Sequence, residues 1–304
     1  MARRSPSQKL RGRPLHGWLV IDKPAGKTSA GVVAEVKRLT QAAKAGHGGT
    51  LDPLATGILP VALGEATKTV PYLMDRAKSY RFTVRWGETR TTDDEEGEVT
   101  GTSALRPSAS DIEAVLPKFN GDIEQKPPIF SAIKVGGQRA YDLARKGESV
   151  ELAPRLVRVT RFVMTSCSDA DSSEFEVDCG KGTYVRALAR DLAAALGTRG
   201  YVARMRRTQV GPFYDTAAIS LDKLAELSHS AALFEAILPV ETVLDDIPAL
   251  ALTGPQADRL SSGQMVRVLN VADGVYCARS AECFVALAQA NAGEIRPLRV
   301  FNLR

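Results

Sequence analysis

Cysteine and histidine are scarce in this sequence, which has four cysteines and three histidines among its 304 residues. Zinc sites need ligands at close, characteristic spacings, and disulfide frameworks need paired cysteines. Neither pattern is present, because the cysteines form no C-x-x-C pair and do not cluster with the histidines (Cys167, Cys179, Cys277 and Cys283). We therefore expect a reduced, cytoplasmic protein that holds no structural metal.

Long apolar runs are absent as well. No stretch of about eighteen consecutive apolar residues occurs, so we expect no membrane-spanning helix. Residues 1–16 are basic but lack the apolar centre of a secretion signal. We interpret them as a basic, disordered tail.

Excess charge is confined to this tail. The chain has a formal net charge of +5, and residues 1–16 contain five basic residues and no acid. The rest is balanced, but its basic residues gather in residues 134–161 and 181–207, whereas acids gather in residues 93–98. Such stripes favour a polyanionic partner such as nucleic acid, although solvated helix faces give the same pattern.

Strand and helix patterns divide the chain into two parts. Residues 79–86 alternate strictly, with Tyr80 and Trp86 on the apolar face, and therefore predict a strand with one wet face. A helix capped by Thr28 or Ser29 is expected shortly after the N-terminal strand. After about residue 245 only short strand-like runs occur, which predicts a small all-β module.

The most unusual stretch is "GHGGTLDPLATG" at residues 46–57. Three explanations compete for a carboxylate in such a turn: a phosphate-binding loop, a metal turn, and a catalytic acid. Asp52 is followed by Pro53, which fixes the backbone, and the glycines would let a bulky substrate approach closely.

The alternatives to a catalytic acid are weak. "DKPAGKTS" has Ile21 where a phosphate loop needs its first glycine, and "GHGG" has Leu51 where a dinucleotide fingerprint needs its last. The acidic run "TTDDEEGE" lacks the alternating spacing of a calcium loop. His47 and Asp52 alone are too sparse a ligand set for a metal turn.

Five segments in this order resemble the signature motifs of bacterial tRNA pseudouridine-55 synthases of the TruB type. They are "DKPAGKTS", "GHGGTLDPLATGILPVALGEATK", "KSYRF", "SAIKVGGQRAYDLARKG" and "GKGTYVRALARDL". The resemblance implies an enzyme that isomerises uridine to pseudouridine in the T-loop of tRNA, without cofactor or metal. It also implies a partner in the tRNA T-arm, no protein partner, no membrane, and a monomer.

The resemblance further implies a fold and a domain plan. The expected fold is the α/β (α+β) pseudouridine synthase fold, a mixed, largely antiparallel sheet flanked by helices, over residues 17–240. A thumb-like insertion is expected at about residues 120–155. Residues 245–304 resemble the small β-rich RNA-binding modules of the pseudouridine synthase and archaeosine transglycosylase (PUA) type.

Individual residues match the motif positions of the family. Asp52 falls on the catalytic aspartate, Arg186 on the arginine paired to it, and Tyr80 on the tyrosine that stacks on the target base. Asp94 lies where the family has an acid that braces the arginine, although Thr91 replaces an aspartate usual in that loop. Further residues match positions implied to bind the RNA substrate: His47, Tyr184, Met205, Lys23 and Lys134.

Two other functions share these features. A guide-RNA-dependent pseudouridine synthase has the same aspartate loop, but the thumb-like stretch and short C-terminal part favour a stand-alone enzyme. A non-catalytic RNA-binding protein or tRNA-folding helper would keep the surface and lose the chemistry, which the presence of Asp52, Tyr80 and Arg186 argues against.

Because no cofactor or metal motif is present, we predict that activity needs neither. Exhaustive treatment with EDTA should leave pseudouridine formation on a prefolded RNA unchanged, as measured by pseudouridine sequencing. Loss of activity that zinc or magnesium restores on that same folded RNA would contradict the prediction.

Overall fold

The computed structural model describes residues 12–281 and 283–303 of the chain. Most of the expected tail, residues 1–16, therefore lies outside the described residues. Its last part is attached to the body, because the Arg13 amide donates a hydrogen bond to the Gln41 carbonyl at 2.6 Å. The packed chain thus begins earlier than the tail boundary that we expected.

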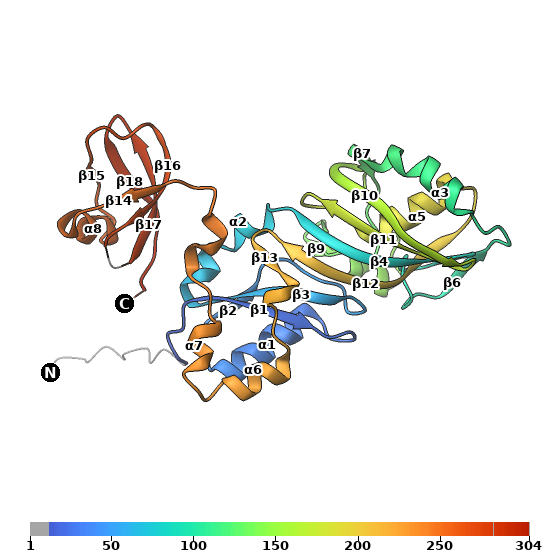
Figure 1. The fold of residues 1–304 in the computed structure, drawn as a ribbon, viewed down its shortest axis with the longest axis horizontal. Coiled ribbons are helices and arrows are strands. Elements are labelled where there is room, and N and C mark those ends of the chain that lie inside the picture. The colour runs from blue at the N-terminus through green and yellow to red at the C-terminus, as the bar shows by residue number, and fades with distance from the viewer. Residues whose placement is uncertain (1–11, 282, 304) are drawn as a thin grey trace.

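A nine-stranded mixed sheet forms the centre of the larger part of the molecule (Figure 1). Its strands are β1 (Gly17–Lys23), β2 (Ala45–His47), β3 (Thr56–Leu63), β4 (Lys78–Trp86), β7 (Gly121–Gln125), β10 (Arg155–Asp169), β11 (Ser172–Cys179), β12 (Gly200–Val210) and β13 (Phe213–Tyr214). The main order is β1-β3-β12-β4-β11-β10-β7. Only β12 and β3 pair in parallel. The expected mixed, largely antiparallel sheet is confirmed.

The alternation expected in β4 explains how this sheet is covered. Phe82 and Trp86 are buried, whereas Arg81 and Arg85 are exposed on the other face. The buried face shares the main hydrophobic core with the apolar residues of helix α5 (Val185–Ala195). Packing of α5 against β4 and β12 therefore fixes where the first turn of this helix lies.

Helices also cover the other end of the sheet. Helix α1 (Ser29–Thr40) begins at the expected cap, where the Thr28 hydroxyl accepts a hydrogen bond from the Gly31 amide at 3.0 Å. Figure 1 shows α1 next to α6 (Leu221–Leu227) and α7 (Ala232–Ala236), beside β1 and β3. The cap and this packing together define where the chain turns into the glycine-rich loop.

The expected thumb is a separate small unit. The chain leaves the sheet after β7 and returns at β10, so the first residues of the expected range 120–155 belong to the sheet. Between them lie the hairpin β8 (Lys134–Val135) and β9 (Gln138–Arg139) and helix α4 (Ala140–Arg145). A small core of its own holds the unit together (Ala140, Val150, Leu152, Ile133 and Leu143).

The C-terminal part is a five-stranded sheet with one helix. Its elements are β14 (Ala249–Ala251), α8 (Gly254–Ser261), β15 (Val266–Arg267), β16 (Gly274–Arg279), β17 (Phe284–Asn291) and β18 (Glu294–Val300), with strand order β14-β16-β17-β18-β15. This sheet stands beside the main body in Figure 1. Its Phe284 and Phe301 join a core that also contains Trp18 and Phe213 of the main body. The Lys68 ammonium adds a hydrogen bond to the Val300 carbonyl at 2.9 Å.

The remaining elements connect these units. They are α2 (Val70–Met74), β5 (Glu88–Arg90), β6 (Val99–Thr102), α3 (Ala109–Val115) and short 3₁₀ turns at 64–68, 116–119, 215–217 and 240–244. Among the residues that the structure describes, no helix is long and apolar enough to cross a membrane.

The shared core predicts that the C-terminal sheet stabilises the whole chain. Phe301→Ala should lower the free energy of unfolding by about 3 kcal/mol or more, because it leaves a cavity beside Phe284, whose ring lies 4.6 Å away. Leu298→Ala is the matched control, since Leu298 is 53% exposed whereas Phe301 is 4% exposed. Equal losses in urea unfolding of the two variants would show that Phe301 is not part of a shared core.

Candidate active site

Two glycines of the turn at residues 46–57, Gly48 and Gly57, are needed by the protein's own packing. A Cβ atom at Gly48 would lie 2.4 Å from the Leu73 side chain. Gly57 has φ +97°, and a Cβ atom there would lie 2.2 Å from the Arg207 carbonyl. We expected these glycines to admit a substrate, but at both positions they admit neighbouring protein atoms instead.

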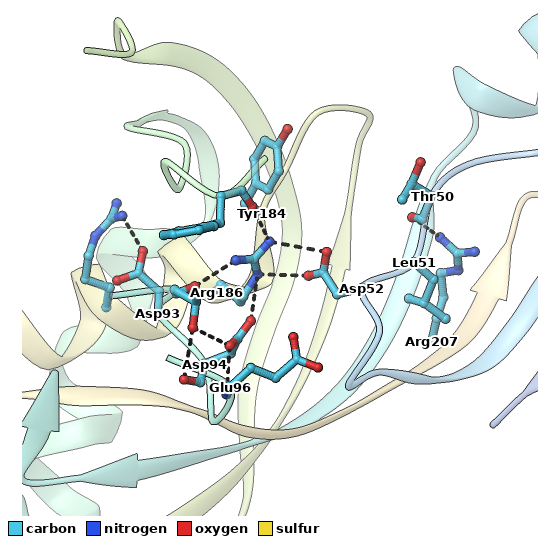
Figure 2. Close-up of polar contacts among 12 residues, drawn as sticks. Thr50, Leu51, Asp52, Asp93, Asp94, Glu96, Tyr184, Arg186 and Arg207 are labelled. Atoms are coloured by element: carbon cyan, nitrogen blue, oxygen red, sulfur yellow. Dashed lines mark hydrogen bonds and ion pairs between the residues drawn. The ribbon is translucent and has the colours of Figure 1, made fainter. Parts of the chain in front are cut away.

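Arg207 binds the backbone of this turn from the interior of the protein. Its side chain is buried and donates to three backbone carbonyls, those of Ile58 at 2.9 Å, Thr50 at 3.1 Å and Gly49 at 3.2 Å. Figure 2 shows Arg207 next to Thr50, at a distance from the carboxylates. Because the carbonyls bind a buried cation, the turn has one preferred shape. Sequence reasoning missed this role.

Lys23 holds the same turn on its other side. The fully buried Lys23 ammonium donates to the carbonyls of Lys27 at 2.7 Å, Pro24 at 2.9 Å and Pro53 at 2.9 Å. Burial lowers the pKa of Lys23 to about 8, although the nearby Asp52 acts to raise it. We expected Lys23 to bind substrate, but all three of its donors are used inside the protein, next to the residue that follows Asp52.

The turn presents Asp52 to Arg186. The Arg186 guanidinium donates to both carboxylate oxygens, from Nε to Oδ2 at 2.8 Å and from Nη2 to Oδ1 at 3.2 Å (Figure 2). Arg186 is 4% exposed, whereas the Asp52 side chain is 32% exposed. The cation is therefore enclosed, and the carboxylate is the member of the pair that solvent or a substrate can reach.

Arg186 stands in an unfavourable place for a cation. It is the second residue of α5, where the partial positive charge of a helix N-terminus disfavours another positive charge. Burial opposes its charge as well, but Asp52 and Asp94 together raise the pKa of Arg186 above its usual range. The two carboxylates thus offset the unfavourable effects of burial and of the helix N-terminus on the positive charge of Arg186.

The acidic loop supplies the other partners of Arg186. The Thr92 carbonyl accepts from Nη1 at 2.7 Å, and Asp94 Oδ2 lies 3.5 Å from Nε. Asp94 is buried, which raises its pKa, and its other oxygen accepts from the Glu96 amide at 3.1 Å. The Thr91 hydroxyl accepts from the Glu98 amide at 3.1 Å, whereas Asp94 lies beside the guanidinium (Figure 2).

Two tyrosines flank the pair. Tyr80 of β4 lies opposite Arg207 in the sheet, and burial raises the pKa of its phenol, with Arg207 and Asp52 among the nearby charges that act on it. Tyr184 precedes α5, and burial raises its pKa too, next to Asp52 and Arg186. Figure 2 shows the Tyr184 ring above the guanidinium. The site therefore combines one accessible carboxylate with two flat apolar surfaces.

The remaining expected residues lie at different depths. His47, on β2, is half-buried, and burial together with Arg207 and Arg139 lowers its pKa, so its imidazole is uncharged near neutral pH. Met205 is buried in the main core, where it supports the site from within. Lys134 is exposed on the thumb and lines a hollow of ≈ 580 Å³.

Several basic residues of the stretch at residues 181–207 are engaged by the protein itself. We interpreted the basic stretch at residues 181–207 as an RNA-binding stripe, but its arginines mostly bind protein groups. Arg207 is buried, and Arg206 forms an ion pair with Asp22 at 2.9 Å. Arg190 binds Asp93 at 2.8 Å. The stretch is basic in the sequence because the acids that pair with its arginines come from distant parts of the chain.

Metal ligands do not gather in this site. Within residues 12–281 and 283–303, no group of three or more histidine, cysteine, aspartate or glutamate side chains could hold a metal ion. The four cysteines are free thiols.

Comparison with known proteins places this site in a family. Residues 37–185 match the model of the TruB family pseudouridylate synthase N-terminal domain, and residues 186–245 match that of the tRNA pseudouridylate synthase B C-terminal domain. The site residues of the turn and the acidic loop fall in the first of these matches, and Arg186 is the first residue of the second.

Individual relatives match nearly the whole chain. The tRNA pseudouridine synthase B of Bradyrhizobium diazoefficiens is 56% identical over 301 residues, 96% of this chain and 87% of that protein. The protein of the same name from Rhodospirillum rubrum is 51% identical over 307 residues, covering 98% of this chain and 100% of that one.

Solved structures share the fold. A chain in the structure of an H/ACA RNP bound to a substrate RNA containing 2'-deoxyuridine superimposes with a TM-score of 0.73. It is 23% identical and is matched over 99% of this chain and 92% of its own length. From the sequence identity to its relatives, rather than from the fold alone, we conclude that the chain belongs to the TruB family of pseudouridylate synthases and is an isomerase.

Proposed function

We propose that this enzyme is a tRNA pseudouridine(55) synthase, which converts a flipped-out uridine of the T-loop to pseudouridine with Asp52 as its catalytic group. The observation that carries the proposal is the two-point ion pair between a buried Arg186 and an accessible Asp52. The names of the close relatives support tRNA as the substrate.

The chemistry needs one carboxylate held in its charged form. Isomerisation breaks the bond between N1 and C1′, rotates the uracil and forms a new bond between C5 and C1′. A carboxylate can attack the sugar carbon, or remove a proton from the sugar to form a glycal, and either route leaves the C5 proton to be removed later. Arg186 orients the Asp52 carboxylate in both routes, because it donates to both oxygens.

The neighbouring aromatic rings suit a base that has left its stack. A reacting nucleotide inside folded RNA must flip out before a protein carboxylate can reach its sugar. Tyr80 lies close enough to Asp52 to be influenced by its charge, and stacking of one base on such a ring contributes about 1–3 kcal/mol. Tyr80 therefore offers a platform for the uracil while Asp52 acts on the ribose.

The RNA-binding surface that we propose is centred on the thumb. Lys134, Arg139, Arg145 and Lys146 line one hollow there. The charge of Arg139, at the end of β9, also helps to lower the pKa of His47. A thumb with exposed cations, near the carboxylate, fits a phosphate backbone running into the site.

The enzyme works in the cytoplasm as a monomer on its tRNA substrate in this proposal. Residues 17–240 form the catalytic domain, joined by the attached end of the basic N-terminal stretch, and residues 245–304 form the PUA-like module, which contributes RNA affinity rather than chemistry. Support comes from the free thiols and from the separate five-stranded sheet at the C-terminus.

Asp52→Asn should abolish turnover and leave RNA binding largely intact. The amide keeps the shape and one acceptor for Arg186 but cannot act as nucleophile or base, so the single-turnover rate should fall by roughly 10²–10⁴-fold or more. Asp93→Asn is the control, since Asp93 binds Arg190 rather than Arg186 in the same region. Near-normal pseudouridine formation by the Asp52 variant would refute the assignment.

Salt dependence should locate the RNA-binding surface on the thumb. Lys134 and Lys146 are exposed and have no ion pair among the described residues. Replacing both by alanine should flatten the log–log dependence of affinity on salt by about 0.7–0.9 per lost phosphate contact. The rate at saturating RNA should be unchanged.

Arg206→Ala is the matched control for that experiment, because Arg206 is already paired with Asp22. It should leave the salt slope unchanged. If instead Arg206→Ala flattens the slope and the thumb variant does not, RNA binds along β12 and the assignment of the thumb is wrong.

A further inference from the structure

The segment that joins the thumb to the sheet contacts the helix that carries Arg186. Gln125 is the last residue of β7, and it pairs with Arg155, the first residue of β10. These two residues therefore form the base of the thumb, and residues 126–154 lie outside the sheet.

Gln125 is the most enclosed polar residue of this base. It is 1% exposed, and its amide makes two hydrogen bonds with the backbone of Tyr184. Gln125 Oε1 accepts from the Tyr184 amide at 2.8 Å, and Nε2 donates to the Tyr184 carbonyl at 3.1 Å. Tyr184 is the N-cap residue of α5, and no side chain caps this helix. The two bonds hold the backbone two residues before Arg186.

Two carbonyls of the segment after Gln125 bind arginines of α5. The Lys126 carbonyl accepts from Arg190 Nη2 at 2.7 Å, and the Phe130 carbonyl accepts from Arg186 Nη2 at 2.9 Å. The same Nη2 atom donates to Asp52. The thumb base therefore supplies part of the hydrogen-bond shell of the guanidinium that orients the carboxylate.

The link between these contacts is stiff. Pro127 and Pro128 lie between the Lys126 and Phe130 carbonyls, and both are buried. Each proline ring restricts φ, so the stretch cannot bend freely. If the thumb moves away, Arg186 loses an acceptor in a site where water scarcely reaches, and an unpaired buried donor is costly. Displacement of the thumb and the geometry of the Asp52–Arg186 pair are therefore linked.

We propose that Gln125 is a positioning residue for the reaction and that docking of the thumb base on α5 is a condition for a competent Asp52–Arg186 pair. Gln125 does not touch the substrate; it acts through Tyr184 and Arg186. The inference rests on the proposed function, in which the thumb binds RNA. It adds that RNA held by the thumb also holds the catalytic arginine in place.

The test is Gln125→Met, which keeps the approximate volume and removes both hydrogen bonds. Single-turnover pseudouridine formation at saturating T-arm RNA should be slower by about tenfold or more, the equivalent of one unit of log rate. The dissociation constant for the RNA should change by less than about threefold, since no cation is lost. Glu124→Met, at the exposed neighbouring position of β7, is the matched control and should keep the wild-type rate.

Hydrogen exchange supplies a readout that does not depend on activity. In the free Gln125→Met protein, the amides of Lys126 and of residues 129–133, together with those of residues 183–187, should exchange faster, while those of β17 keep their protection. Faster exchange in the first segment alone would overturn the proposed link. A wild-type rate in Gln125→Met would overturn it too, as would a defect that disappears at saturating RNA.

A second variant keeps the test decisive if Gln125→Met does not fold. Pro128→Ala retains both bonds of Gln125 and loosens the link, so the rate should fall by a smaller factor, with unchanged RNA affinity. An unchanged rate in a folded Pro128→Ala protein would then overturn the proposal. Absence of pseudouridine formation by the wild-type protein would refute the proposed function instead, and the exchange experiment would still judge the link.

Discussion

The site depends on one buried cation. Arg186 lies in the first turn of a helix and is almost fully enclosed, two conditions that disfavour a positive charge. It is stable there because Asp52, the Thr92 carbonyl and the Phe130 carbonyl all accept from it, with Asp94 close by. Three separate segments of the chain must therefore converge on α5, and the carboxylate that they leave partly open is Asp52.

Two further buried cations shape the turn that carries this carboxylate. Lys23 and Arg207 donate hydrogen bonds to backbone carbonyls on either side of Asp52 in the sequence. An irregular turn cannot satisfy its carbonyls within a sheet or helix, so a buried cation that binds several of them fixes its shape. The donors of both side chains are therefore used within the protein, although Lys23 lies in one of the motifs that identify the family.

The sequence predicts the sheet and the constellation better than it predicts the use of its charges. Strict alternation in β4 and the cap at Thr28 follow from local periodicity and are present as expected. The sequence predicts that Asp52, Asp94 and Arg186 lie together only through the ordered family motifs, because no local sequence pattern relates residues so far apart in the chain. Arg207 could have been suspected, since it lies two residues after buried Met205 on one strand and shares its face.

The partners of the basic residues explain why a count of basic residues along the sequence does not show which of them are free to bind RNA. In residues 181–207, Arg190, Arg206 and Arg207 meet acids or carbonyls from other segments, so their charge contributes to folding. On the thumb, Lys134 and Lys146 meet no such partner among the described residues, and their charge remains available to a polyanion. The free cations suit the RNA binding that we propose, and the buried cations order the turn that carries Asp52. Because the thumb base also supplies an acceptor to Arg186, RNA bound by the free cations would act directly on the segment that orders the buried one.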